Sequence, residues 1–344
     1  MDDTHRRASD PEFARAVAAL RSADRVVIAT HENPDGDAIG SLVAAAAGLR
    51  GLGKEVRTYL EPCSSIPSEL RLLDVSRLER QLDPAGLAGW TLLALDCATV
   101  RRLGRGHRPV VEAAATVVDV DHHYDNTRFG DVNLIDGAAS STAEILLDVL
   151  AALDVELTPE IAQALYVALV TDTGRFQQRT TGPSALRMAA RLVDAGVDIQ
   201  LVYERVFETM PLRKLRLLGV VIGHLVLYER GRVAVSHVSR DDFLRLGAAE
   251  SDTEGLVDNL RAISGVEVAG LIREPPLGFD GIAPPNRVSL RSRGAIDVSE
   301  IARKTGGGGH KQAAGFSHGG DVESIRRFIA AEAAARLPRA GSAA

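Results

Sequence analysis

The sequence contains little cysteine, and its apolar runs are short. Cys63 and Cys97 are the only cysteines among 344 residues, which is too few for a disulfide framework and fits a reducing compartment. The apolar stretch Leu42–Leu49 is far shorter than the ~20 residues that a membrane helix needs. The segment Met1–Asp10 is charged and lacks the apolar centre of a signal peptide. These absences predict a cytoplasmic protein with no membrane partner.

Basic and aromatic residues are also scarce. Lys and Arg number 40 against 46 Asp and Glu, the net charge is −6, and aromatic residues make up 4%. A protein that binds long nucleic acids needs a basic track or a row of stacking aromatic side chains, so the composition argues against this class. The charge is uneven: residues 1–210 carry −10 and residues 211–344 carry +4. Unless this is chance, the acidic half could hold cations and the basic half anions.

The sequence does contain alternating strand and helix patterns. Apolar runs predict strands at Arg25–Thr30, Glu55–Leu60, Thr91–Leu95 and Thr116–Val120. Helical patterns separate or follow them, and this alternation indicates an α/β domain with a mostly parallel sheet. A chain of 344 residues is long enough for a second domain.

The pattern changes after residue 209. A helical run at 210–225 is followed by hairpin-like strands and further helices, which predict a smaller mixed α/β domain. We therefore predict a metal-binding catalytic domain over residues 1–209, a helical linker over 210–225 and a substrate-binding domain over 226–344.

The first chemical motif directly follows the first predicted strand. His31, Asp35 and Asp37 lie within seven residues, in a loop that also contains Pro34 and Gly36. One aspartate before a helix is an ordinary cap, which is the alternative interpretation. Proline fixes the backbone and glycine permits a tight turn, so both carboxylates can face one point. The segment favours metal binding.

Two further motifs end other predicted strands. Asp96 could bridge two cations, although aspartates often end strands for turn reasons. Asp121, His122 and His123 follow the next strand, and adjacent side chains of an extended backbone point in different directions. We therefore expect His122 to bind metal, His123 to face substrate and Asp121 to orient an imidazole, with a solvated turn as the alternative. The segment Ser140–Glu144 is interpreted first as a capping box and second as a substrate contact.

These motifs predict one metal centre, because the carboxyl ends of parallel strands meet in one crevice. Asp172 joins them, since an aspartate at the end of a helix is unfavourable unless a cation compensates; a solvated aspartate beside a Gly174 cap is the alternative. Oxygen ligands with some imidazole and no thiolate suit Mn²⁺ better than Mg²⁺ and argue against structural zinc. Two cations ~3.5–4 Å apart could activate water and stabilise both reacting oxygens of a phosphate ester. The predicted ligands are His31, Asp35, Asp37, Asp96, His122 and Asp172.

A glycine-rich segment in the second half predicts an anion site. Thr305–Lys311 contains four consecutive glycines followed by a histidine and a lysine. A flexible linker is the alternative, but the run lies between a predicted helix and an apolar strand. Backbone N–H groups of glycines can approach an anion closely, and an arginine on the preceding strand could bind phosphate through two hydrogen bonds. The predicted substrate-binding residues are Arg291, Ser292, Gly308, Gly309, His310 and Lys311.

With these residues in order, the chain resembles the DHH phosphoesterase superfamily. Within it, the chain is similar to the bacterial nano-RNase and pAp phosphatase group, which pairs a DHH domain with a DHH-associated C-terminal domain. The resemblance runs from about Asp24 to the final helix and rests on five motifs: His31–Asp37, Asp96, Asp121–His123, Thr171–Gly174 and Gly306–His310.

The resemblance implies a role for each motif. One Mn²⁺ would be held by His31, Asp35 and Asp96. A second would be held by Asp37, Asp96, His122 and Asp172, with Asp96 as the bridge. The catalytic residues would be Asp96, Asp121 and His123, with His123 at the scissile phosphate. The terminal phosphate or nucleotide would be held by Arg291, Gly309, His310 and Lys311.

The implied activity is hydrolysis of small phosphate esters with two Mn²⁺, for which Mg²⁺ or Co²⁺ could substitute. The implied substrates are short RNA oligonucleotides (nanoRNA), cleaved as by an exonuclease, and the 3′-phosphate of 3′-phosphoadenosine 5′-phosphate (pAp). Cyclic dinucleotides such as c-di-AMP and linear pApA are further candidate partners, and a homodimer is compatible with the sequence. The alternatives are a family II-type inorganic pyrophosphatase, whose C-terminal cluster of Ser, Arg and Lys is not evident, and a non-catalytic nucleotide-sensing module, which the intact metal motifs disfavour.

Overall fold

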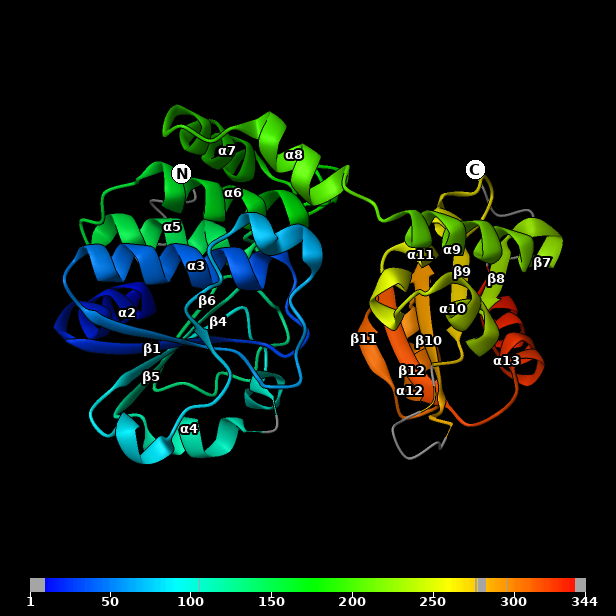
Figure 1. The fold of residues 1–344 in the computed structure, drawn as a ribbon, viewed down its shortest axis with the longest axis horizontal. Helices are drawn as coiled ribbons and strands as arrows, with labels where there is room; N and C mark the ends of the chain where they lie inside the picture. Colours follow the sequence, from blue (N-terminus) through cyan, green and yellow to red (C-terminus); the bar gives the residue numbers. More distant parts are fainter. Residues whose placement is uncertain (1–9, 105, 276, 278–282, 295, 338–344) are drawn as a thin grey trace. The chain divides into compact units, whose positions relative to one another are not determined.

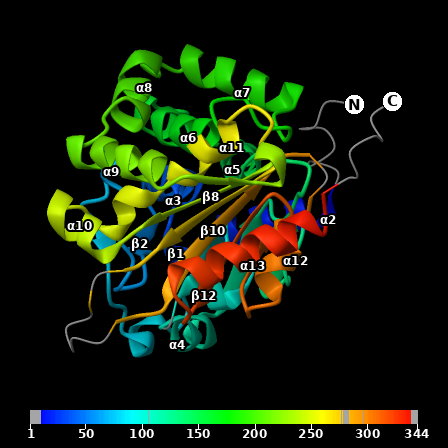
Figure 2. The same cartoon turned by 90° about the vertical axis from the view of Figure 1, so that its right-hand side faces the viewer.

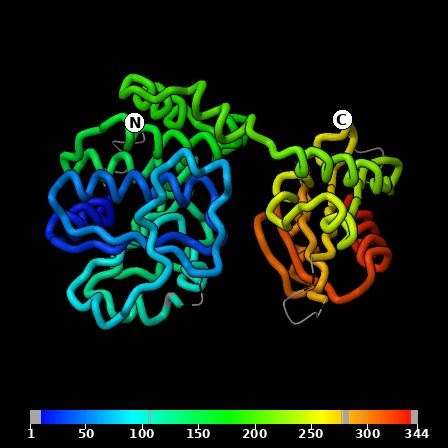
Figure 3. The backbone as a smooth tube through the Cα atoms, in the orientation of Figure 1, coloured from blue at the N-terminus to red at the C-terminus, as the bar shows by residue number. Residues whose placement is uncertain are grey.

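The chain divides into two compact units, Met1–Thr209 and Met210–Ala344. The structure is a computed structural model, and it describes residues 10–104, 106–275, 277, 283–294 and 296–337. The backbone trace passes from the first unit to the second once, after α8 (Ile199–Phe207) (Figure 3). Each unit has its own six-stranded sheet.

The first unit is built on a parallel sheet (Figure 1). Its strand order is β3-β2-β1-β4-β5-β6, and every neighbouring pair is parallel. The strands are β1 (Arg25–Thr30), β2 (Glu55–Tyr59), β3 (Leu78–Glu79), β4 (Thr91–Leu95), β5 (Thr116–Asp121) and β6 (Val132–Ile135). The α/β class and the four predicted strands are confirmed, and β3 and β6 add an unpredicted edge strand on each side.

The strand order places the ends of three strands together. The chain moves outward from β1 to β2 on one side and returns to β4 on the other, so β1 and β4 form a topological switch point. Thr30 pairs with Leu95, and Leu95 pairs with Val120. The next residues along the chain are His31, Asp96 and Asp121. They therefore lie side by side at the carboxyl ends of three neighbouring strands.

Helices cover both faces of this sheet because its central strands are apolar on both sides. One face packs against α2 (Pro11–Ser22), α3 (Gly36–Gly51), α5 (Thr142–Ala152) and α6 (Pro159–Asp172), with α7 (Pro183–Asp194) and α8 outside them (Figure 1). The other face packs against α4 (His107–Ala113) and the short helices η2 (Pro84–Leu87) and η3 (Val100–Leu103). Within the described parts of the chain, no helix is long and apolar enough to cross a membrane.

The second unit has a mixed sheet with the order β11-β12-β10-β9-β8-β7, and only β8 and β9 pair in parallel. The strands are β7 (Val226–Tyr228), β8 (Val233–Val238), β9 (Val268–Arg273), β10 (Asn286–Ser292), β11 (Gly308–His310) and β12 (Ala313–His318). Helices α12 (Val298–Arg303) and α13 (Val322–Ala334) cover one face (Figure 2). The other face packs against α9 (Leu212–Gly223), α10 (Arg240–Leu246) and α11 (Leu256–Ala262).

The segment predicted as a linker, residues 210–225, forms α9 and belongs to the second unit. Leu217 and Val221 lie four residues apart on one face of α9, and both are fully buried in the core beneath α10 and α11. Their burial stabilises α9 as a packed helix of this unit, which the helical pattern alone did not reveal.

A histidine pair in the second unit predicts pH-dependent stability. The rings of His224 and His237 stack with centroids 4.2 Å apart, and Arg326 Nη2 lies 3.0 Å from His237 Nδ1. Burial, together with the charges of His224 and Arg326 and against that of Asp242, lowers the pKa of His237 to about 4. The unfolded chain has an ordinary histidine pKa of roughly 6.5, so it binds a proton where the folded chain does not. The stability that neutral His237 contributes to the second unit is therefore fully present above a pH of roughly 6.5 and is lost as the pH falls toward 4.

Hydrogen-exchange protection of the β8 amides at pH 7.5 and pH 5 measures this effect. We expect protection to fall at pH 5 in the wild type and to fall less in His237→Gln. The matched variant His318→Gln, on β12, should keep the wild-type difference. An unchanged difference in His237→Gln would show that another group causes the pH dependence.

Candidate metal centre

The predicted ligands gather at the switch point of the first sheet. Side chains form three groups whose ligand atoms lie within 4.8 Å of one another. They are His31 with Asp35 and Asp96, Asp37 with His122 and Asp172, and Asp96 with Asp121, His122 and His123. Asp96 occurs in two groups, and its Oδ1 lies 3.6 Å from His122 Nε2. Two neighbouring ion sites that share Asp96 can therefore be built from these residues.

Two histidines present the same nitrogen to the carboxylates. His31 Nδ1 lies 2.8 Å from the carbonyl oxygen of Glu32, and His122 Nδ1 lies 3.4 Å from that of Ala139. When Nδ1 donates to a carbonyl oxygen, Nε2 carries the lone pair that binds a metal. His31 Nε2 is buried without a hydrogen bond in the described part of the chain, and it lies 3.4 Å from Asp96 Oδ2. A cation bound between His31 Nε2 and Asp96 Oδ2 would give each of these buried atoms a partner.

Burial and mutual repulsion act on the carboxylates. Burial, followed by the charges of Asp96 and Asp172, raises the pKa of Asp37 well above its usual range. Burial, with the charges of Asp96 and Asp35, raises the pKa of Asp172 to about 7. Burial also opposes ionisation of Asp96, but the neighbouring ring and charge of His31, with Nε2 at 3.4 Å, outweigh it and lower the pKa of Asp96. A divalent cation would favour the charged form of every carboxylate, so the donor set fits such an ion.

Close packing of α3 on α6 brings two of these carboxylates together. Asp37 lies in the first turn of α3, and Asp172 is the last residue of α6. A Cβ atom on Gly36 would lie 2.2 Å from Thr171 Oγ1, so the approach requires glycine. Asp35 caps α3 by accepting a hydrogen bond from the Ala38 amide. The same side chain lies near His31, so Asp35 can act both as the helix cap and as a metal ligand.

The N-terminus of α5 holds Asp37. The backbone amides of Thr142 and Ala143 donate to its two carboxylate oxygens over 2.6 and 3.1 Å. Thr142 Oγ1 also donates to Asp96 Oδ1 over 3.1 Å. A helix N-terminus favours negative charge, so α5 keeps this buried aspartate in place. Thr142 therefore connects two predicted metal ligands.

The capping box predicted at Ser140–Glu144 differs from the observed contacts. Ser141 is the residue before α5, but its side chain makes no capping hydrogen bond. Glu144 instead accepts from the backbone amide and the hydroxyl of Ser140. The first backbone amides of α5 are therefore free to donate to Asp37. This contact with Asp37 could not be recognised from the local Ser140–Glu144 motif.

Asp121, expected to orient an imidazole, is hydrogen-bonded to the ring of His123. Asp121 Oδ1 accepts a 2.7 Å hydrogen bond from His123 Nδ1 and a 2.8 Å bond from the His122 amide. Burial lowers the pKa of His123, but the hydrogen bond and charge of Asp121 outweigh it and raise that pKa to about 9. Asn126 Nδ2 donates to both Asp121 and Asp119. Asn126, in the turn after the histidines, is a positioning residue that the sequence analysis did not assign.

Strand pairing in the second unit places Arg291 and His310 on one face of the sheet. Arg291 is opposite Ala313 on β12, and His310 is opposite the same Ala313. Directly paired residues point to the same face, so only a small side chain separates the two. Arg291 Nε lies 3.4 Å from Asp258 Oδ1. The other predicted residues of the anion site are all exposed, namely Gly308, Gly309, His310 and Lys311. Together with Arg291, they offer hydrogen-bond donors to an anion.

Gly309 and Ser292 differ in how well they fit the predicted anion site. Gly309 has a φ of 135°, and a Cβ there would lie 2.5 Å from the carbonyl oxygen of Ala313, so the close strand pairing requires glycine. Ser292 follows Arg291 and therefore points to the opposite face. It is fully buried, and its hydroxyl donates to the carbonyl oxygen of Ile296 over 2.7 Å. The Ser292 side chain therefore does not share the face of the sheet that carries Arg291 and His310.

Comparison with known proteins is consistent with this geometry. The chain matches the DHH family, N-terminal domain, over residues 25–169 and the DHHA1 domain over residues 231–335. A relative from Thermus thermophilus, named bifunctional oligoribonuclease and PAP phosphatase NrnA, is 34% identical over 319 residues, which cover 92% of this chain and 91% of that protein. The chain belongs to the DHH family.

Two further proteins are similar to most of this chain. A Bacillus subtilis protein with the same name is 28% identical over 305 residues, covering 86% of this chain and 89% of its own. The crystal structure of an exopolyphosphatase-related protein from Bacteroides fragilis has a TM-score of 0.84 at 23% identity, with 92% and 94% of the two chains covered. It shares the fold. The DHH match contains five of the six predicted metal ligands and ends just before Asp172.

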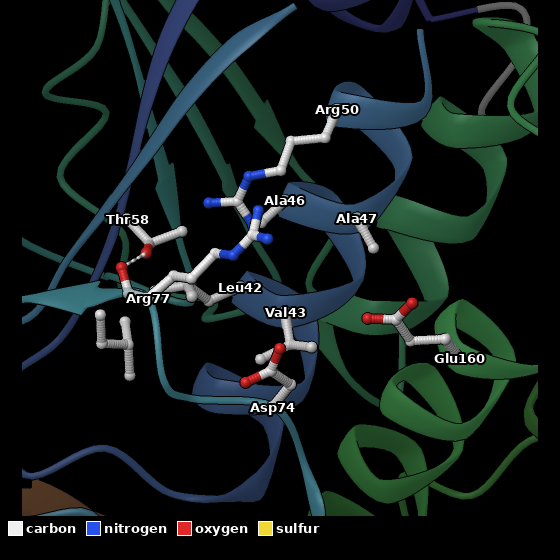
Figure 4. Close-up of a pocket in the computed structure, with 10 residues that line it drawn as sticks. Leu42, Val43, Ala46, Ala47, Arg50, Thr58, Asp74, Arg77 and Glu160 are labelled. Atoms are coloured by element: carbon white, nitrogen blue, oxygen red, sulfur yellow. Dashed lines mark hydrogen bonds between the residues drawn. The ribbon is translucent and has the colours of Figure 1, made fainter. Parts of the chain in front are cut away.

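A small pocket elsewhere in the DHH unit does not extend the metal centre. It has a volume of about 20 Å³ and lies over α3, next to β2 (Figure 4). Charged side chains of both signs line it, namely Arg50, Arg77, Asp74 and Glu160. None of the predicted metal or substrate residues takes part.

Proposed function

We propose that this DHH protein is a phosphoesterase that uses two Mn²⁺, with Mg²⁺ or Co²⁺ as substitutes. Its substrates are short oligoribonucleotides and pAp, from which it removes the 3′-phosphate. The observation that carries the proposal is the convergence of two histidine Nε2 atoms and four carboxylates at one edge of the sheet. The names of the Thermus and Bacillus relatives support the substrate class.

In this proposal, the first ion is held by His31, Asp35 and Asp96, and the second by Asp37, Asp96, His122 and Asp172. When bound, two divalent ions supply Lewis acidity to the attacking and leaving oxygens of a phosphate ester. Asp121 holds the His123 ring through Nδ1, so that Nε2 can donate a hydrogen bond to a phosphate oxygen. The α5 N-terminus keeps Asp37 in position during this reaction.

The DHHA1 unit supplies the anion site in this proposal. Arg291 and His310 bind a terminal phosphate of the substrate, with Lys311 and the amides of Gly308 and Gly309 beside them. Small dinucleotides such as pApA and c-di-AMP carry the same phosphodiester chemistry and are proposed as further substrates.

A substrate panel tests the proposed function. With Mn²⁺ present, the purified protein should release product from pAp, dinucleotide RNA, pApA and c-di-AMP. Turnover of inorganic pyrophosphate in place of these substrates would favour a pyrophosphatase. Tight nucleotide binding without turnover would favour a sensing module.

Substrate length should strongly affect the rate. Between two and twenty nucleotides, kcat/KM for RNA is expected to fall steeply, because the net charge of −6 and an aromatic content of 4% provide little further binding for a long strand. His310→Ala should raise KM for dinucleotides by about tenfold or more through loss of a charge-assisted hydrogen bond. It should affect long RNA less. Gln312→Ala, an exposed residue two positions away, is the matched control. A flat or rising profile would indicate a processive exonuclease.

A further inference from the structure

We propose that Arg102 is a further catalytic residue, whose guanidinium binds the oxygens of the phosphate under attack next to His123. This inference rests on the proposed function and adds a second side chain, beside His123, that contacts the reacting phosphate. It is carried by the position of Arg102 in the fold, by its contact with His123 and by its lack of an acidic partner among the described residues.

The backbone of Arg102 is fixed to two of the metal-binding loops. Arg102 lies in η3, the short helix that follows Asp96 along the chain. Its amide donates to the carbonyl oxygen of Thr99 over 2.9 Å, and its own carbonyl oxygen accepts the amide of Glu32 over 2.5 Å. Glu32 follows His31 directly. The loops after β1 and β4 are therefore joined through this residue.

The side chain of Arg102 extends to the substrate-facing histidine. Its Nη1 lies 3.4 Å from Nε2 of His123, whose other ring nitrogen is held by Asp121. Nε2 is the atom proposed to contact phosphate. An arginine donor at this distance can contact the same anion.

Arg102 differs in its partners from the arginines that form ion pairs. Arg57, for example, forms an ion pair with Glu79, and Arg291 lies near Asp258. No ion pair between Arg102 and an acidic residue is found in the described part of the chain, although its side chain is half-buried beside a carboxylate-rich centre. Guanidinium groups are always charged and have no acceptor atom, so such a position favours a planar, two-oxygen contact with phosphate.

Phosphate transfer accumulates charge on the oxygens around phosphorus, and a fixed donor at that point lowers the barrier. We expect Arg102→Ala to lower kcat/KM by about 10²-fold, mainly through kcat, on pAp and dinucleotide RNA alike. Arg102→Lys should lose about tenfold because lysine keeps the charge without the paired geometry. Arg101→Ala, which removes an exposed arginine from the same turn, should keep wild-type rates.

Two measurements decide the outcome. Titration of inorganic phosphate into the Mn²⁺-loaded protein should show at least about tenfold weaker binding in Arg102→Ala, with unchanged Mn²⁺ affinity. Equal phosphate affinity, or a kcat within twofold of the wild type, would overturn the inference. Loss of Mn²⁺ binding or of the fold would show a structural role instead, which also overturns it. Failure of the wild type to turn over any substrate would count against the proposed function, and the phosphate titration would still test Arg102.

Discussion

Replacing Asp96 by asparagine is expected to lower kcat by on the order of 10³-fold or more, since it removes the one carboxylate shared by two ligand groups. Asp96 lies 3.4 Å from His31 Nε2 and 3.6 Å from His122 Nε2, so each of the two proposed ions would lose a ligand. Asp35→Asn should cost less, about 10–100-fold, because Asp35 belongs to one group and its side chain is 55% exposed. Initial rates with saturating Mn²⁺ measure the difference.

The backbone makes asparagine a suitable replacement. Asp96 has a φ of 56°, and asparagine is among the residues that tolerate the left-handed region best. The variant should therefore fold, which circular dichroism and a thermal melt can verify. Asp125→Asn, an exposed aspartate in the turn after the histidines, is the control. Near-normal turnover of Asp96→Asn would require the two-ion interpretation to be abandoned.

The clustering of the candidate ligands could be predicted because most of them lie at or near the end of a recognisable strand or helix. In a parallel sheet, the row that pairs Thr30 with Leu95 and Val120 also aligns the residues after them. Residues that directly follow neighbouring parallel strands are therefore expected to lie close together, and this can be predicted from the sequence. The oxygen and imidazole donors of these residues then favoured metal-assisted hydrolysis over a nucleotide-sensing module.

Other contacts depend on packing that no local pattern shows. Thr142 meets Asp37 from 105 residues away, and Arg102 meets His123 through two different loops. The strand β11 consists of two glycines and a histidine, which have little strand propensity, so it forms only because β12 lies beside it. Ser292 was misjudged because the alternation of the strand sends neighbouring side chains to opposite faces.

Removal of divalent metal is expected to abolish turnover and to make the stability of the first unit depend on pH. Without metal, burial and the charges of Asp96 and Asp35 raise the pKa of Asp172 to about 7. The same residue in the unfolded chain titrates near 3.9. Between these values, the folded chain holds a proton that the unfolded chain releases, so stability falls as pH rises from about 4 to about 7. Asp37, whose pKa is also raised, acts in the same direction.

Denaturant unfolding followed by the fluorescence of Trp90, the single tryptophan, reports on the first unit. After chelation, the wild type should be less stable at pH 7.5 than at pH 5, and the Asp172→Asn variant should show a smaller difference because it lacks that carboxylate. Mn²⁺ at 100 times its dissociation constant should restore roughly 2.7 kcal/mol per ion to the wild type and less to Asp172→Asn. Histidines also titrate in this range, so the comparison of the two proteins, with Asp125→Asn as the control, isolates the contribution of Asp172. An equal pH dependence in all three would mean that repulsion among the carboxylates does not limit the metal-free fold, and the electrostatic argument for a cation at this centre would lose its support.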